Sequence, residues 1–200
     1  MTQYDTARVP RWLVLSLQSY AFLSGAKWIE EEGARIHERV RQNDLKRLMK
    51  LQLPRNMKVF EDPAYKLIAP MDFQSTQWKG DLAVRARLRN SEGRFVYRTR
   101  FMFELKFQDA NSDAFDRDLY KLARLCRAKR ARNRNCRSFL VILGRGAPHQ
   151  RFAEFGRPCI FHPAAMPTLR GSHVTRGIFT ATAIGREHNA HYVCLVEVTA

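Results

Sequence analysis

The 200 residues of the chain are 45% hydrophobic and 27% charged, a balance that is typical of a folded globular domain and excludes a disordered or fibrous protein. The 35 Lys and Arg residues outnumber the 19 Asp and Glu residues, and the net charge of +16 favours a polyanionic partner, nucleic acid ahead of a membrane surface, over an ordinary small-molecule substrate. No apolar run approaches the ~20 residues that a membrane span needs, so we expect no membrane partner.

The four cysteines are spread along the chain without any CxxC spacing. They match neither a zinc site nor a disulfide framework. We therefore expect reduced thiols and a cytoplasmic location.

The first predicted helix follows Pro10, which suits the first position of a helix. Leu13, Leu17, Tyr20 and Ser24 come next at helical spacing. The same stretch faintly imitates a secretory signal peptide, but polar residues interrupt its apolar part, which favours the helix.

Residues 27–51 predict one long amphipathic helix. Its apolar stripe consists of Ile29, Gly33, Ile36 and Val40. Farther along the chain, residues 65–68 predict a short strand.

Period-two alternation predicts two strands, over residues 82–88 and 95–107. In both segments one set of alternate positions is mainly apolar and the other carries most of the charges. Residues 90–93, Asn-Ser-Glu-Gly, supply turn chemistry between them, so the two strands predict a hairpin.

A helix beginning at Ser112 follows, with Asp113, Asp116 and Asp118 in its early turns and basic residues late. Its apolar stripe consists of Phe115, Leu119, Leu122 and Cys126. The continuous apolar run 139–143 then predicts a strand that is buried on both faces, and residues 192–198 predict a further strand. We therefore expect one domain over residues 1–200, of the α/β class, with a mixed sheet flanked by helices.

The predicted hairpin brings two carboxylates to one face. With a loop of two or four residues, Asp81 lies opposite Met102, and Glu104 is its diagonal neighbour about 7–8 Å away at the backbone. Lys106 projects from the same face. A three-residue loop would place Asp81 on the opposite face.

Two carboxylates beside a lysine suit phosphodiester hydrolysis. Mg²⁺ (or Mn²⁺) prefers carboxylate oxygens and phosphate, and it makes hydroxide available at neutral pH. A lysine beside the ion can orient the attacking water or neutralise developing charge.

Asp81, then twenty-two intervening residues, then Glu104-Leu105-Lys106 at the end of a strand before a helix resembles the motif of the PD-(D/E)XK nuclease superfamily. The resemblance implies a restriction-endonuclease-like fold, with core order αβββαβ over about residues 27–143 and a C-terminal strand region over 144–200. Gly80 stands where the name of the motif has proline, a departure that many members share.

The resemblance also implies the roles of individual residues. Asp81 and Glu104 would bind the metal ion, the Leu105 carbonyl would complete its ligation, and Lys106 would serve the water. Many members add a glutamate from the first helix. Glu32 is the choice here, and the open alternatives are Glu30, Glu31 and Glu38.

Two groups of basic side chains are candidates for contacts with nucleic-acid phosphates. The first group, expected on the same face as Asp81, comprises Arg85, Arg87, Arg98 and Arg100. The second group follows the end of the helix and the loop after it, and comprises Arg124, Arg127, Lys129, Arg130, Arg132 and Arg134. Aromatic residues do not interleave with the second group, so it predicts phosphate contacts and not base stacking.

The sequence thus predicts a Mg²⁺-dependent nuclease that hydrolyses phosphodiester bonds, in DNA more than in RNA. The alternative from another class is a non-catalytic nucleic-acid-binding or assembly subunit of a recombination, restriction or repair complex. A third hypothesis is a subunit that cleaves only inside such a complex, where a protein partner supplies specificity. Pairing into a homodimer stays open.

Overall fold

The computed structural model describes residues 3–30, 38–73, 77–131, 135–162, 169–182 and 190–200, except for the side chains of residues 28–30 and 38. Within these residues one eight-stranded sheet has the order β1-β7-β8-β5-β4-β3-β2, with β6 also paired to β7. The strands are β1 (Gln3–Tyr4), β2 (Met57–Glu61), β3 (Leu82–Arg89), β4 (Phe95–Phe107), β5 (Arg137–Arg145), β6 (Pro158–Phe161), β7 (Gly171–Ala181) and β8 (His191–Thr199). The helices are α1 (Arg11–Glu30), α2 (Glu38–Gln52), α3 (Tyr65–Ile68), α4 (Ser112–Ala131) and the 3₁₀ turn η1 (Gln150–Phe152).

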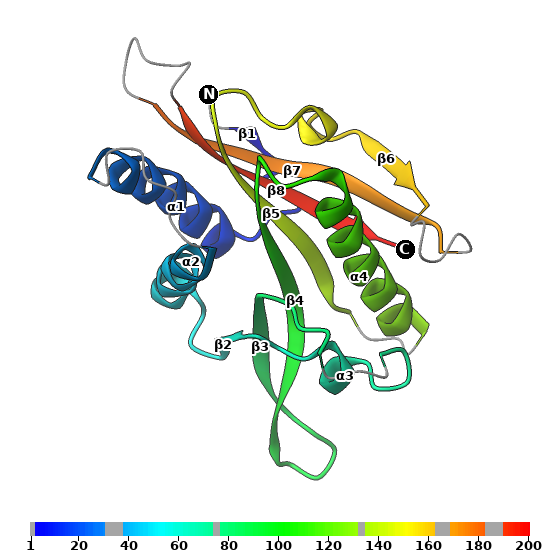
Figure 1. Cartoon of the computed structure of the whole chain (residues 1–200). Coiled ribbons are helices and arrows are strands. Elements are labelled where there is room, and N and C mark those ends of the chain that lie inside the picture. Colours follow the sequence, from blue (N-terminus) through cyan, green and yellow to red (C-terminus); the bar gives the residue numbers. More distant parts are fainter. Residues whose placement is uncertain (1–2, 31–37, 74–76, 132–134, 163–168, 183–189) are drawn as a thin grey trace.

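The sheet is mixed and mostly antiparallel. Among the strand pairs of the described residues, β4 and β5 are the parallel one, and α4 connects them. Figure 1 shows α1 and α2 to one side of the sheet and α4 to the other. The expectation of an α/β fold with a mixed sheet flanked by helices is confirmed.

Strand β5 contributes to the apolar cores on both sides of the sheet. Leu140 and Ile142 pack in the core beneath α4, whereas Phe139 and Val141 pack in the core beneath α1 and α2. All four side chains are fully buried. The prediction of a doubly buried strand is confirmed, and its burial explains why the run contains no polar residue.

The predicted hairpin, the helix at Ser112 and the C-terminal strand are also confirmed, as β3–β4, α4 and β8. On α4, the buried Phe115, Leu119 and Leu122 form the expected stripe against the sheet. The loop end of the hairpin extends past the helices at the bottom of Figure 1.

The helix predicted behind Pro10 is confirmed as α1, which buries Leu13, Leu17 and Tyr20 in the core that it shares with α2. No helix in the described ranges combines the length and the apolar character needed to cross a membrane.

The prediction of one helix over residues 27–51 is wrong. Helix α1 ends at Glu30 and α2 begins at Glu38, and residues 31–37 lie outside the described ranges. Helix α2 buries Leu45 and Met49, whereas Val40 of the predicted stripe is 39% exposed. Val40 therefore does not belong to the buried face of α2, and Gly33 and Ile36 of the predicted stripe lie outside the described residues.

The prediction of a strand over residues 65–68 is also wrong, because these residues form the short helix α3. The Ala69 N–H donates to the Tyr65 carbonyl at 2.8 Å, which closes one helical turn. Residues three apart share a face in a helix but not in a strand, and both Tyr65 and Ile68 are buried. The strand before β3 is β2, so the described order α2, β2, α3, β3, β4, α4, β5 matches αβββαβ when the single helical turn α3 is left aside.

Four charged side chains form an ion network across β5, β8 and β7, here called the charge ladder: Arg137, Glu197, Arg176 and Asp5. Glu197 of β8 accepts hydrogen bonds from Nε of Arg137 and from Nε of Arg176, both at 2.8 Å. Arg176 lies at an irregularity in β7 and also pairs with Asp5 at 3.3 Å. Burial alone would raise the pKa of Glu197, but the two guanidinium groups outweigh it and lower that pKa.

The first prediction concerns the core. Phe103 is fully buried and its ring stacks on those of Phe101 and Phe139, with centroids 6.4 and 5.6 Å away. Phe103→Ala should lower the free energy of unfolding by about 3–5 kcal/mol, because it removes a ring and leaves a cavity. Urea unfolding measures this loss.

The control is the same change at Phe95 in the same strand, where the side chain is 53% exposed. Phe95→Ala should cost less than about 1 kcal/mol. Equal losses at both positions would contradict the core described here.

Candidate active site and basic surface

A β-bulge in the hairpin decides which side chains share a face of the sheet. Near the loop, Arg85 pairs with Thr99, whereas farther inside the sheet Leu82 pairs with Phe103. The two registers differ by one residue, so Arg100 is an extra residue in β4. Side chains beyond such a bulge change face relative to the partner strand.

The bulge brings Asp81 to the face of Glu104. Residues 90–94 separate the strands. If the pairing next to this loop continued unchanged to Asp81, its side chain would lie on the face opposite to that of Glu104. Continuing the register inside the sheet places Asp81 opposite Glu104 and not opposite Met102 as predicted. The shared face is as expected, but it arises from a different register.

Asp81 is held against the backbone of β4. Its Oδ2 accepts a hydrogen bond from the Leu105 N–H at 2.6 Å, and its carbonyl accepts one from the side-chain amide of Gln42 on α2. Asp81 is half-buried, so both the strand and the helix fix its position at the start of β3.

Glu104 lies deeper, with 2% of its surface exposed. The Tyr65 hydroxyl donates to its Oε1 at 2.6 Å, and the Lys121 ammonium lies 3.5 Å from the same oxygen. Burial, together with the nearby carboxylates of Asp118 and Asp81, raises the pKa of Glu104 well above its ordinary value. The site therefore carries more negative charge than its two partners compensate.

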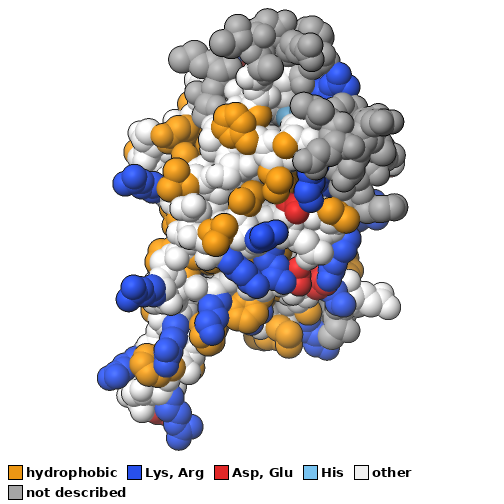
Figure 2. Space-filling model, turned by 90° about the vertical axis from the view of Figure 1, so that its left-hand side faces the viewer, with side chains coloured by type: hydrophobic (Ala, Val, Ile, Leu, Met, Phe, Trp, Pro, Cys, Tyr) orange, Lys and Arg blue, Asp and Glu red, His pale blue; other side chains and the backbone are white. Residues whose placement is uncertain are grey.

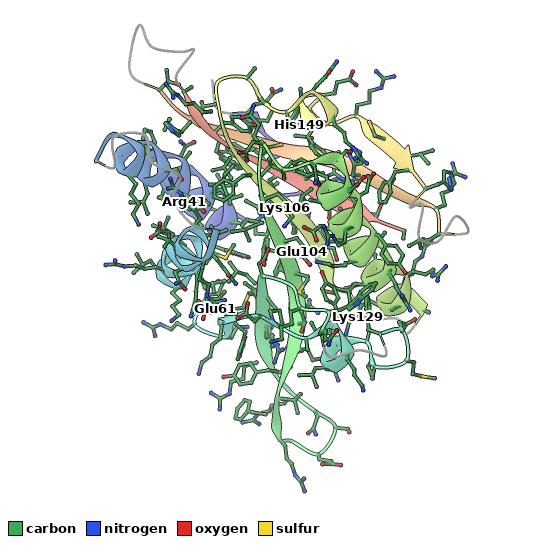
Figure 3. The ribbon with its side chains drawn as sticks, in the orientation of Figure 1. Arg41, Glu61, Glu104, Lys106, Lys129 and His149 are labelled. Atoms are coloured by element: carbon green, nitrogen blue, oxygen red, sulfur yellow. The ribbon has the colours of Figure 1, made fainter. Side chains whose placement is uncertain are left out.

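Lys106 points at α4 and pairs with Asp118, Nζ to Oδ2, at 3.0 Å. The other oxygen of Asp118 pairs with Lys121 at 2.6 Å. Burial alone would lower the pKa of Lys121, but the Glu104 and Asp118 carboxylates outweigh it and raise that pKa. Figure 3 shows Glu104 and Lys106 on β4, between α2 and α4.

Asp118, Lys121 and Tyr65 complete this cluster and were not predicted as parts of it. Asp118 was assigned to the early turns of its helix for its charge, yet it is 2% exposed. It lies three residues after Phe115 and next to Leu119, so helical periodicity already placed this carboxylate on the buried stripe. Tyr65 had no comparable signal.

The donor groups suit a hard divalent cation. The carboxylates of Asp81, Glu104 and Asp118 lie close enough together to raise the pKa of Glu104, and a divalent ion would neutralise that excess of negative charge. Within the described ranges, however, no set of three or more His, Cys, Asp or Glu side chains is arranged to hold a metal ion. The fit is therefore one of donor chemistry, with Asp81 and Glu104 as the two carboxylate donors.

The predicted metal site also included the Leu105 carbonyl and a glutamate from the first helix. The Leu105 carbonyl, predicted as a metal ligand, accepts a hydrogen bond from Lys106 Nζ at 3.3 Å. Glu32 and Glu31 lie outside the described residues, as do the side chains of Glu30 and Glu38.

The first predicted basic group divides between the two faces of the hairpin. Arg85 lies 4.6 Å above the ring of Phe60, and Arg87 lies 3.7 Å above the ring of Phe95. Arg98 pairs with Ala86, which follows Arg85 in β3 and therefore faces the other way. The prediction that all four arginines share one face is thus wrong for Arg98. The bulge is the reason, because it shifts the alternation of β4 at Arg100.

The arginines still form a basic surface. Arg87, Arg98 and Arg100 are exposed, and a polar hollow of about 290 Å³ is bordered by Arg85, Arg98, Arg100 and Lys129. Figure 2 shows Lys and Arg side chains along the projecting end of the molecule, where the hairpin leaves the sheet.

The second predicted basic group is less uniform than its sequence. Lys129 is 7% exposed and donates to the Ile68 carbonyl at 2.8 Å. It thus connects α4 to α3, and its assignment as a solvent-facing phosphate contact is wrong. Arg124 is half-buried among the rings of Phe73, Trp78 and Tyr120. The remaining members are exposed at Arg127 and Arg130, or lie outside the described residues at Arg132 and Arg134.

Comparison of the chain with known protein families, with curated proteins and with solved structures finds no match.

The second prediction concerns the pH dependence of stability. The raised pKa of Glu104 means that, above the ordinary glutamate value of 4.5, the folded protein keeps a proton that the unfolded chain releases. Stability therefore falls as the pH rises through the window between the two values. Glu104→Gln keeps an acceptor for Tyr65 and removes the charge, so it should raise the free energy of unfolding at pH 8 by about 1 kcal/mol or more and change it little at pH 4.5.

Urea unfolding over this pH range measures the effect. Glu92→Gln is the control, because that side chain is 64% exposed in the hairpin loop and its loss should leave the pH profile unchanged. A Glu104→Gln protein that is less stable than the original at pH 8 would show that Lys121 holds Glu104 ionised.

Proposed function

We propose that the protein is a metal-dependent nuclease of the PD-(D/E)XK kind, which hydrolyses phosphodiester bonds in DNA with Mg²⁺ (or Mn²⁺) as its cofactor. The observation that carries the proposal is the convergence of Asp81, Glu104 and Lys106 on one face of the hairpin, where it enters the sheet. The element order αβββαβ supports the same reading, because it is the core order of the restriction-endonuclease-like fold.

Each side chain has a role that its surroundings support. Asp81, Glu104 and the Leu105 carbonyl would hold the ion, which when bound polarises the phosphate and lowers the pKa of its water. Lys106 already lies on the Leu105 carbonyl, so its ammonium is within reach of a water there and of the charge that develops on phosphate. Asp118 holds that ammonium at 3.0 Å, which makes it the residue that positions Lys106.

Lys121 and Tyr65 act on the carboxylates. Lys121 bridges Asp118 and Glu104, and Tyr65 donates to Glu104 from its buried hydroxyl. Burial, followed by the charge of Glu104, raises the pKa of Tyr65 well above its ordinary value. Tyr65 thus stays a hydrogen-bond donor over the whole working range of pH and orients the Glu104 carboxylate.

The basic hairpin supplies the surface for the substrate. The exposed guanidinium groups of Arg98 and Arg100 belong to β4, the strand that also carries Glu104. Guanidinium groups favour phosphate oxygens, so a duplex that lies along the hairpin would present its backbone to the carboxylates.

A specific contact favours a second candidate, a nucleic-acid-binding or assembly subunit without catalysis. Lys106 is paired with Asp118, and two ammonium groups already offset most of the charge of the three carboxylates. A cluster that is neutralised in this way can serve stability alone. The two candidates differ in whether the protein cleaves DNA when Mg²⁺ is added.

The third prediction tests the catalytic residues. Asp81→Asn and Lys106→Gln should each lower the rate of Mg²⁺-dependent cleavage by about 100-fold or more, because they remove a metal ligand and the group that serves the water. Single-turnover cleavage of a labelled DNA duplex at saturating protein measures the rate. Binding, measured with Ca²⁺ in place of Mg²⁺, should be unchanged or tighter for Asp81→Asn, because a charge that repels phosphate is lost.

Asp113→Asn is the matched control, since Asp113 is exposed in the first turn of α4. It should cleave at the rate of the unaltered protein. If the unaltered protein binds DNA without cutting it, the subunit without catalysis is the better account. If Asp81→Asn cuts at full rate, the proposed metal ligand is wrong.

The fourth prediction concerns the basic hairpin. Phosphate contacts release counterions, so the logarithm of the binding constant falls with the logarithm of the salt concentration by about 0.9 for each contact. Replacing Arg87 and Arg100 together by Gln should weaken DNA binding and reduce this slope by about 1.8. Fluorescence anisotropy over a salt series measures both quantities.

The control makes the same change in charge on the helices α1 and α2, as Arg11→Gln with Arg47→Gln, two exposed arginines. It should leave the slope unchanged within error. Equal slopes for both double variants would show that the net charge, and not the hairpin, governs binding.

A further inference from the structure

A cavity of about 590 Å³ lies at the carboxyl ends of β4 and β5. Helices α1 and α2, the start of β8 and residues 147–150 complete its wall, and the wall is mainly apolar, from side chains such as Phe107, Leu143 and Pro148. Its volume is in the range of about 300–1,000 Å³ that is common for small-molecule sites. Among its described lining residues are none of the carboxylates of the candidate active site.

Arg41 is the unusual member of this wall. It is 5% exposed, yet its Nε and Nη1 atoms have no hydrogen-bond partner within the described ranges. Its backbone carbonyl accepts a hydrogen bond from the Tyr20 hydroxyl at 2.9 Å, but this contact does not involve the guanidinium. Buried N–H groups without a partner cost stability, so the contacts among the described residues give no structural reason for these two groups. Figure 3 shows Arg41 on α2 and His149 beyond the end of β5.

The surroundings of Arg41 are electropositive. Arg145, His149 and His191 also line the cavity, and Asp109, which is exposed, is the carboxylate among its described lining residues. Burial, followed by the charges of Arg145 and Arg41, lowers the pKa of His191. The cavity thus holds positive charge that an anion would balance.

A glycine maintains the shape of the cavity. A Cβ atom on Gly144 would overlap the ring of Tyr192 and the side-chain amide of Gln108. Without that atom, both side chains lie against β5. The Gln108 carbonyl then accepts from the Arg145 N–H at 3.0 Å, and the Tyr192 hydroxyl accepts from the His149 N–H at 3.0 Å. These contacts fix two sides of the wall.

We propose that this cavity binds a small organic oxyanion, a phosphate monoester or a carboxylate on an apolar body, with the anionic group on the guanidinium of Arg41. A guanidinium binds two oxygens of one carboxylate or phosphate through Nε with Nη2 or through Nη1 with Nη2, so each of the two atoms without a partner belongs to one such edge. The apolar body packs against Phe107, Leu143 and Pro148. The proposal is independent of the proposed nuclease activity.

The test uses two anions and their uncharged counterparts on the full chain. Thymidine 5′-monophosphate is compared with thymidine, and benzoate with benzamide, by isothermal titration calorimetry. At least one anion should bind about tenfold more tightly than its counterpart, and the pair that differs identifies phosphate or carboxylate as the group bound. The same anion should raise the pKa of His191, followed by NMR of the imidazole, because it balances the charge of Arg41.

Arg41→Met keeps the apolar length of the side chain and removes the charge. It should abolish the tenfold preference and the change at His191, whereas Arg47→Met, an exposed arginine on the same helix, should preserve both. Arg41→Met should also raise the urea midpoint of the protein without ligand, because it removes the two buried N–H groups that have no partner among the described residues.

Three outcomes would overturn the proposal. The first is equal affinity of the unaltered protein for the charged and uncharged members of both pairs, or no binding of either anion. The second is a preference that persists in Arg41→Met. The third is a lower urea midpoint, or loss of folding, in Arg41→Met, which would assign Arg41 to the packing of α2.

Discussion

Side chains alternate between the two faces of a sheet along each strand, so one additional residue in β4 reverses the face of every side chain beyond it. Arg100 is that residue. It lies between the basic ribbon and the carboxylates, and the register on its loop side would turn Asp81 toward the apolar core under α1 and α2. With the bulge, Asp81 faces α4, where Asp118 and Lys121 meet Glu104. The geometry of the whole cluster depends on this irregularity in the pairing of two strands.

The two buried glutamates of the sheet show how partners decide the effect of burial. Glu197 receives hydrogen bonds from two guanidinium groups, and its pKa is lowered in spite of its burial. Glu104 shares its lysine with Asp118 and has a second carboxylate, Asp81, nearby, and its pKa is raised. One site is a completed internal ion network. The other gathers three carboxylates beside two lysines, and Asp81 is the carboxylate among them that is partly exposed.

Much of the fold was predictable because its signals are local. The run 139–143, the two strands of the hairpin and the stripe of α4 each depend on neighbouring residues, and all three elements are confirmed. The errors occurred where distant contacts decide. Tyr65 lies in a helical turn from which its hydroxyl reaches Glu104, 39 positions away, and the buried Lys129 donates a hydrogen bond to the Ile68 carbonyl, 61 positions away.

The candidate site was predictable in part and for a partly different reason. Asp81, Glu104 and Lys106 share a face as expected, but the observed loop over residues 90–94 would not produce that arrangement without the bulge, and no local pattern indicates a bulge at Arg100. Asp118 was detectable as a carboxylate on an apolar stripe. Arg41 was not, since a charge in the predicted solvent-facing part of a helix gives no sign that it is buried.

The charge ladder at Glu197 also bears on the solubility of the protein. The outer edge of β7 is covered by β6 over residues 171–174 and by β1 over residues 177–178. An uncovered strand edge is a template for pairing with another copy of the chain, and a strand as short as β1 contributes few hydrogen bonds of its own. The ion pair between Asp5 and Arg176, with Arg176 held in turn by Glu197, keeps β1 in place. Without this ion pair β1 would be easier to displace, so two charges that lie 171 positions apart in the sequence protect the edge of β7 from pairing with another copy of the chain.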